Sequence, residues 1–103
     1  MVTIERRKSL RYKFEGAIAI NWGGTVLSGR VHEIDSQGMF VEISNPLWIC
    51  ATFYSQLMAE NPNLLDCVVR WVEPGRGMGI SVVAPREEGR KRFAALIDTL
   101  SRE

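Results

Sequence analysis

Apolar and polar residues alternate along much of the chain between Tyr12 and Val83, and this is the pattern of half-buried β-strands. Glycine, proline, asparagine and aspartate interrupt the alternation at short intervals, as turns do. Five or six short strands within about 70 residues are typical of an all-β sandwich or barrel. We therefore predict a mainly β fold, a small six-stranded antiparallel barrel, because closure removes exposed strand edges.

The turn signals divide this region into segments. The predicted strands cover residues 12–22, 25–34, 39–43, 47–53, 65–72 and 78–83. Gly23-Gly24 predicts a tight hairpin, and Asp35-Ser36-Gln37-Gly38 predicts a second turn. Residues 56–63 are expected to form a longer loop, in which 57–60 could make one helical turn.

The C-terminal segment follows a different period. Phe93, Leu96, Ile97 and Leu100 recur at i, i+3, i+4 and i+7, which predicts a helix at about 86–101 with one apolar face. Pro85 suits the first turn of that helix. The apolar face could pack on the barrel or form a homodimer, and we expect residues 12–103 to be one domain.

Composition limits which cellular compartment and which kinds of disulfide or metal chemistry are expected. The longest apolar runs, such as 47–51, are too short to span a bilayer, and no secretory pattern occurs, so the cytoplasm is the expected location without membrane insertion. Two cysteines and one histidine are too few for a disulfide framework or a zinc site. Cys50 and Cys67 lie in apolar runs and are predicted to be buried.

Charge is distributed unevenly. Residues 5–13 hold five basic side chains and one acidic, a net charge of +4, whereas the rest of the chain holds eight basic and eleven acidic, −3. Residues 1–11 have no apolar period and are expected to form a flexible basic arm. A basic footprint this small fits a compact anion better than a nucleic-acid polymer, which needs many distributed phosphate contacts.

Patterns that would indicate catalysis fail on spacing. His32, Asp35 and Ser36 are triad residue types, but within one strand and turn their side chains diverge. Gly75-x-Gly77-x-Gly79 precedes a strand instead of a helix, so it is no dinucleotide fingerprint. We therefore predict no enzyme, no metal site and no cofactor. We expect the three tryptophans to lie in the core or rim of the barrel, and a stacking platform is the alternative.

Three motifs resemble those of PilZ domains. Arg7-Lys8-Ser9-Leu10-Arg11 fits the R-x-x-x-R motif at the start of that family, and residues 33–38 fall where it carries D/N-x-S-x-x-G. Residues 68–80 resemble the last hairpin of the family, and the C-terminal helix follows. The spacing between the motifs, across nearly the whole chain, carries the resemblance.

The resemblance implies a bacterial receptor for the second messenger cyclic di-GMP, which is its ligand and not a cofactor. In this interpretation the arm becomes ordered around the ligand and the domain signals to an unidentified protein partner. The implied ligand-binding residues are Arg6, Arg7, Arg11, Glu33, Asp35 and Gly38.

The second motif departs from the family pattern. Glu33 stands in place of Asp or Asn, and Asp35 in place of Ser. Strand alternation predicts Val31, Glu33 and Asp35 on one face. Glu33 can still accept from a guanine N–H edge, whereas the Asp35 carboxylate would repel a phosphate and weaken binding. Gly38 is expected to have a positive φ and to allow a close approach of the ligand.

Two other functions stay open. The altered second motif fits a degenerate PilZ domain that has lost the nucleotide and works as a protein-interaction module. A barrel with aromatic residues and a basic arm also fits single-stranded nucleic acid, but the charge of −3 outside the arm opposes that interpretation.

Overall fold

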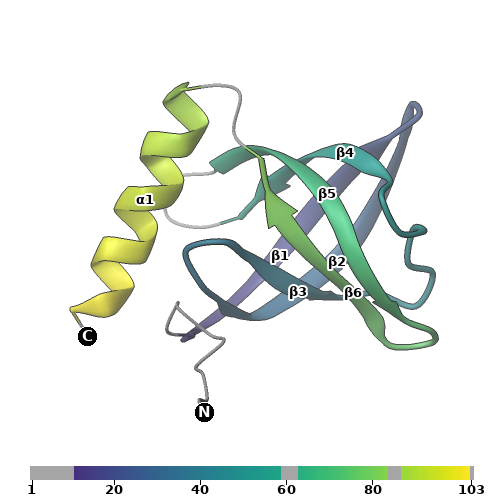
Figure 1. Ribbon diagram of the computed structural model, residues 1–103, viewed down its shortest axis with the longest axis horizontal. Helices are drawn as coiled ribbons and strands as arrows, with labels where there is room; N and C mark the ends of the chain where they lie inside the picture. The colour runs from purple at the N-terminus through teal and green to yellow at the C-terminus, as the bar shows by residue number, and fades with distance from the viewer. Residues whose placement is uncertain (1–10, 59–62, 84–86, 103) are drawn as a thin grey trace, which may run out of the picture.

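Six antiparallel strands close into a barrel, and one helix packs beside it (Figure 1). The computed structural model describes residues 11–58, 63–83 and 87–102. The elements are β1 (Tyr12–Trp22), β2 (Thr25–Ile34), β3 (Gly38–Glu42), β4 (Thr52–Leu57), β5 (Asn63–Glu73), β6 (Gly77–Val82) and α1 (Glu87–Ser101). Around the barrel their order is β1-β2-β3-β6-β5-β4. The predicted fold class is therefore confirmed.

The barrel interior is filled by the apolar half of the alternating pattern. β1 contributes Ile18 and Ile20, β3 contributes Val41, and β5 contributes Leu65 and Val69, each nearly inaccessible to solvent. Because successive side chains of a strand point to opposite faces, the residues between them form the outer surface. That outer surface is where a ligand can reach the protein.

The predicted apolar face of α1 is confirmed. Phe93 is buried, and Leu96, Ile97 and Leu100 pack against the core from its edge. The helix lies against β5 and β1, beside the barrel (Figure 1). No helix among the described residues is long and apolar enough to cross a membrane.

Glycine determines two of the turns. Gly23 and Gly24 have φ of 58° and 83°, so the β1–β2 hairpin needs left-handed backbone at both central positions, as predicted. Gly75 has φ of 76° in the β5–β6 turn. These are conformations that other residues adopt at a cost.

The strand predicted at 47–53 is wrong for residues 47–51. This segment is a loop with a turn, in which the Ala51 N–H donates to the Trp48 carbonyl, and β4 begins only at Thr52. Cys50 has φ of 73° there, which no strand residue adopts. β4 instead runs on to Leu57, where a loop or helical turn was expected. An apolar run of five residues does not by itself distinguish a strand from a partly buried loop.

The cysteines differ from each other. Cys67 is buried as predicted, and burial raises the pKa of its thiol to about 12. Cys50 is exposed, so the prediction for it is wrong. Its left-handed backbone turns the side chain away from the core that the neighbouring Ala51 enters.

Candidate functional site

The outer surface carries a hollow of about 530 Å³ where β2, β3, β6 and β5 lie next to one another. We call it the outer hollow. Of the predicted site residues, Arg11, Glu33, Asp35 and Gly38 all line it, although 27 positions separate the first from the last. Arg6 and Arg7 lie outside the described residues, and their contribution remains a prediction.

An irregularity in β2 builds one wall of the hollow. Val31 and Ile34 are both buried, and the pairing with β3 shifts register between them, which is a β-bulge. His32 and Glu33, the two residues in between, both have exposed side chains. The alternation predicted for Val31, Glu33 and Asp35 is therefore wrong, because one extra residue reverses the faces. The bulge is what directs His32 and Glu33 outward together.

Arg11 reaches this wall from the start of β1. Its Nη1 lies 3.5 Å from Oε1 of Glu33, and both side chains are more than half exposed. An exposed ion pair of this kind contributes only about 0–1 kcal/mol. A ligand can therefore displace the contact at small cost, and both groups are available for binding.

Asp35 holds the turn that begins the next strand. Its Oδ1 accepts the backbone N–H groups of Gln37 at 2.7 Å and Gly38 at 2.9 Å, and its own N–H donates to the Gly38 carbonyl at 2.9 Å. This is an Asx-turn, a normal role for aspartate. The carboxylate thus has a structural task in addition to its place in the outer hollow.

Gly38 is needed for a reason other than the predicted one. Its φ is not positive, and it starts β3 opposite Ser81. A Cβ on Gly38 would lie 1.9 Å from the carbonyl oxygen of Ile80. Close contact between two strand backbones, not turn conformation, therefore excludes a side chain there.

The opposite wall is aromatic. The rings of Phe40 and Trp71 stack with centroids 6.4 Å apart and planes at 29°, and the Arg76 guanidinium lies 5.0 Å from the centre of Phe40. Glu73 accepts from the Trp71 indole at 3.3 Å and from Arg76. Trp71 is 46% exposed, and its ring covers Gly79 so closely that a Cβ there would lie 2.3 Å away.

This aromatic wall was not predicted from the sequence. Trp71 was expected in the core or rim, and its exposed position instead gives the hollow a flat apolar surface. Trp48 is also exposed, and Trp22 packs edge-on against it at 4.9 Å. The signal that was available is the pairing of a glycine with an aromatic residue across the last hairpin, Gly79 opposite Trp71.

The charges of the described lining favour cations over anions. Arg11 and Arg76 stand against four carboxylates, which are Glu33, Asp35, Glu42 and Glu73, so the balance is −2 when His32 is neutral. A phosphate in the hollow therefore needs further positive charge. Arg6, Arg7 and Lys8, which lie three to five positions before Arg11 in the sequence, are one source of that charge.

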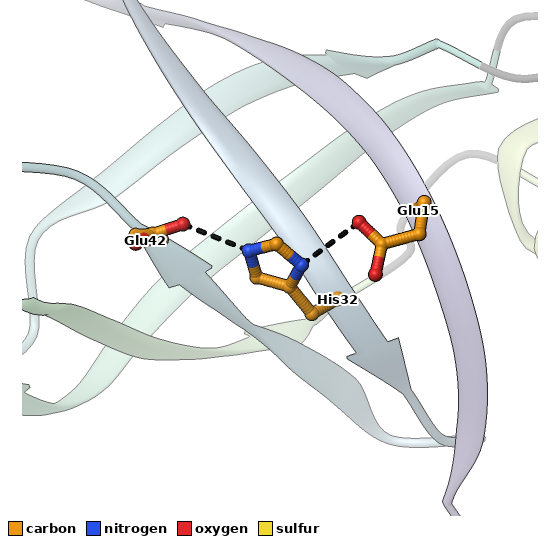
Figure 2. A network of polar contacts seen from close by, with 3 residues as sticks. All are labelled: Glu15, His32 and Glu42. Carbon is orange, nitrogen blue, oxygen red and sulfur yellow. Dashed lines mark hydrogen bonds and ion pairs between the residues drawn. The ribbon is translucent and has the colours of Figure 1, made fainter.

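His32, on the wall that the bulge in β2 builds, connects three strands through its side-chain contacts (Figure 2). Its Nδ1 lies 2.9 Å from Oε1 of Glu15 in β1, and its Nε2 lies 2.8 Å from Oε1 of Glu42 in β3. The hydrogen bond to Glu42 and then that to Glu15 raise the pKa of His32 above its ordinary value of 6.5. No pattern in the sequence predicts this arrangement, which depends on the bulge and on the pairing of β2 with both β1 and β3.

Solved structures similar to this chain include PilZ domains. They include the cyclic di-GMP-bound PilZ domain of YcgR from Escherichia coli, with a TM-score of 0.74, 14% identity, and coverage of 95% of this chain and 93% of that one. The PilZ domain of CeSA from a cellulose-synthesising bacterium matches with a TM-score of 0.75, 16% identity, and coverage of 90% and 99%.

A third similar structure is the Bacillus subtilis inhibitor of motility MotI/DgrA, with a TM-score of 0.72 and 17% identity over 96% of this chain, which spans 51% of that protein. No protein-family model matches the sequence, and no curated protein matches it either. The chain has the PilZ fold. The fold predicted from the motifs is thereby confirmed.

Proposed function

We propose that this domain is a non-enzymatic receptor for cyclic di-GMP, which binds in the outer hollow and orders the basic arm around itself. The observation that carries the proposal is the meeting of Arg11, Glu33, Asp35 and Gly38 at one hollow. The same fold in the YcgR PilZ domain occurs with cyclic di-GMP. The fold, together with the meeting of Arg11 from the R-x-x-x-R motif with residues of the second motif, supports this ligand over an arbitrary anion.

The groups in the hollow match the chemistry of that ligand. A guanine presents O6 and N7 as paired acceptors for a planar guanidinium, as from Arg7 or Arg11. The Glu33 carboxylate can accept from the N1–H and N2–H₂ edge of a guanine. Trp71 offers an exposed ring on which a base can stack, a contact worth about 1–3 kcal/mol.

The arm sets a lower limit on the number of contacts. Ordering six residues costs on the order of 6–12 kcal/mol of backbone entropy, whereas one bidentate guanidinium contact contributes roughly 1–3 kcal/mol. Several contacts on one ligand are therefore needed, and two phosphates with two guanines supply them. A lone phosphate or sulfate does not.

Calorimetric titration with cyclic di-GMP tests the proposal. We expect wild-type protein to bind, and Arg7→Ala and Arg11→Ala each to weaken binding by roughly tenfold or more, as lost bidentate contacts do. Arg102→Ala is the matched control, because Arg102 is an exposed arginine paired with Asp98 on α1 and does not line the hollow. Absence of binding by the wild type, or equal binding by all four proteins, would show the receptor proposal to be wrong.

One observation favours a second function. The described lining has a balance of −2, and the Asp35 carboxylate lies in it. A PilZ fold that has lost its nucleotide and works as a protein-interaction module would tolerate this charge. A silent titration, together with a specific partner whose binding is lost when Trp71 is changed to Ala, would support the module over the receptor.

A further inference from the structure

His32 bridges two carboxylates, and its two contacts cannot both be favourable when the ring is neutral. A neutral imidazole has one N–H donor and one lone pair, and an ionised carboxylate only accepts. With Nδ1 at 2.9 Å from Glu15 and Nε2 at 2.8 Å from Glu42, only the imidazolium donates to both. In either neutral tautomer, one lone pair would face a carboxylate oxygen. The geometry itself therefore favours the protonated ring.

The bridge belongs to the outer hollow. His32 and Glu42 both line it, and His32 is the neighbour of Glu33 in the bulge of β2. Protonation of His32 changes the balance of the described lining from −2 to −1, and it holds the Glu42 carboxylate against the ring. Deprotonation removes that charge and frees one of the two carboxylates.

The other charged groups near His32 come from the same three strands. Register places Lys13 of β1 opposite Glu33, and Arg30 of β2 opposite Glu42 of β3. His32 is the only histidine in the sequence. Among the described residues, no group of three or more histidine, cysteine, aspartate or glutamate side chains could hold a metal ion.

We propose that His32 makes ligand binding in the outer hollow proton-dependent: the protonated ring clasps Glu15 and Glu42 and favours the dianionic ligand, and loss of its proton to solvent weakens binding. The proposal rests on the proposed function, since it concerns regulation of the same site. By reciprocity, a bound anion must also favour protonation of His32, so binding takes up protons.

The direction of the pH dependence follows from the contacts of His32 with the two carboxylates. The pKa of His32 lies above 6.5, so the ring is charged below that pH and loses its charge as the pH rises through the higher value. Affinity for cyclic di-GMP should therefore fall with rising pH. A unit charge about 8 Å from a phosphate, at an effective dielectric between 20 and 80, predicts a fall of roughly twofold to thirtyfold. Because the site is exposed, added salt should reduce this difference.

Calorimetry at about pH 6 and pH 8 in buffers of different ionisation enthalpy tests this, with wild type, His32→Gln and Glu15→Gln. We expect the wild type to bind more weakly at high pH and to take up protons, and His32→Gln to lose both effects. Glu15→Gln removes one carboxylate that does not line the hollow. It should shift the midpoint of the affinity change toward pH 6.5, the ordinary pKa of histidine, an effect that a purely structural bridge would not produce.

The two failures can be distinguished. If no protein binds at either pH, the receptor function is wrong and the proton linkage falls with it. If the wild type and His32→Gln both bind with the same dependence on pH, the receptor function stands and the role of His32 alone is overturned.

Discussion

Asp35 carries two opposing effects that substitution can separate. Its Oδ1 accepts the N–H groups of Gln37 and Gly38, and the side chain also lines the outer hollow. Asp35→Asn keeps an acceptor oxygen in the same place and removes the charge. Asp35→Ser introduces the residue that the resembling PilZ motif carries in the predicted alignment, and Asp35→Ala removes both charge and acceptor.

The contacts of Asp35 set the size of both effects, the one on ligand binding and the one on stability. A carboxylate about 6 Å from a phosphate, at an effective dielectric of about 20, opposes binding by roughly 3 kcal/mol, and nearer 1 kcal/mol when solvent screens it. Asp35→Asn should therefore tighten cyclic di-GMP binding by about fivefold to a hundredfold. The Asx-turn loses only the charge-assisted part of two hydrogen bonds, so unfolding should become easier by less than about 1 kcal/mol.

Calorimetry at two salt concentrations, combined with urea unfolding, measures both effects. We expect Asp35→Asn and Asp35→Ser to bind more tightly than wild type, with the gain reduced at high salt. Asp35→Ala should unfold more easily by about 1–2 kcal/mol, because two N–H groups lose their acceptor. Unchanged or weaker binding by a stably folded Asp35→Asn protein would refute the electrostatic reasoning.

Three further predictions concern stability and reactivity. Gly38→Ala should destabilise the fold by about 3 kcal/mol in urea unfolding, because its Cβ would meet a β6 carbonyl oxygen at 1.9 Å. Gly23→Ala has open space around its Cβ but a φ of 58°, and it should cost only about 1–2 kcal/mol. Equal losses of stability in the two variants would contradict this reasoning. His32→Gln should lower the melting temperature most below pH 6.5, and the difference from wild type should shrink as pH rises through the higher pKa of the folded protein; a constant difference would argue against the charged bridge. A thiol reagent at about pH 8 should label exposed Cys50 quickly and Cys67, with its pKa of about 12, only after unfolding; rapid labelling of two thiols in the folded protein would contradict the burial of Cys67.

Local signals predicted most of the barrel. The pair Gly23-Gly24 located a hairpin because left-handed backbone at two consecutive positions has few sequence solutions. The stripe from Phe93 to Leu100 located α1 because its period does not fit a strand. Both features depend on residues close in sequence, and both are confirmed.

The errors arise where tertiary structure overrides a local pattern. Nothing near Val31 signals that one extra residue bulges out of β2, because the bulge is defined against partner strands. Cys50 adopts a left-handed conformation that its residue type does not suggest. Both features therefore become visible only in the folded structure.

The residues of the candidate site also fall into two groups, those that the sequence could predict and those that depend on tertiary structure. Arg11, Glu33, Asp35 and Gly38 could be predicted because their spacing resembles known motifs, and they do meet at one hollow. The aromatic wall could not, because Phe40 and Trp71 become neighbours only through the closed order β3-β6-β5. His32 required the bulge as well as pairing with strands on both sides.

The negative charge of the outer hollow, which at first argues against an anionic ligand, can instead explain selectivity. The carboxylates of the described lining repel a simple phosphate or sulfate. A guanine nucleotide differs because its N–H groups can donate to Glu33 while its phosphates face the arm. We therefore expect millimolar phosphate or sulfate to compete with cyclic di-GMP no more than chloride at equal ionic strength. Specific competition by sulfate would show that the site recognises charge alone, and it would remove Glu33 from the account of specificity.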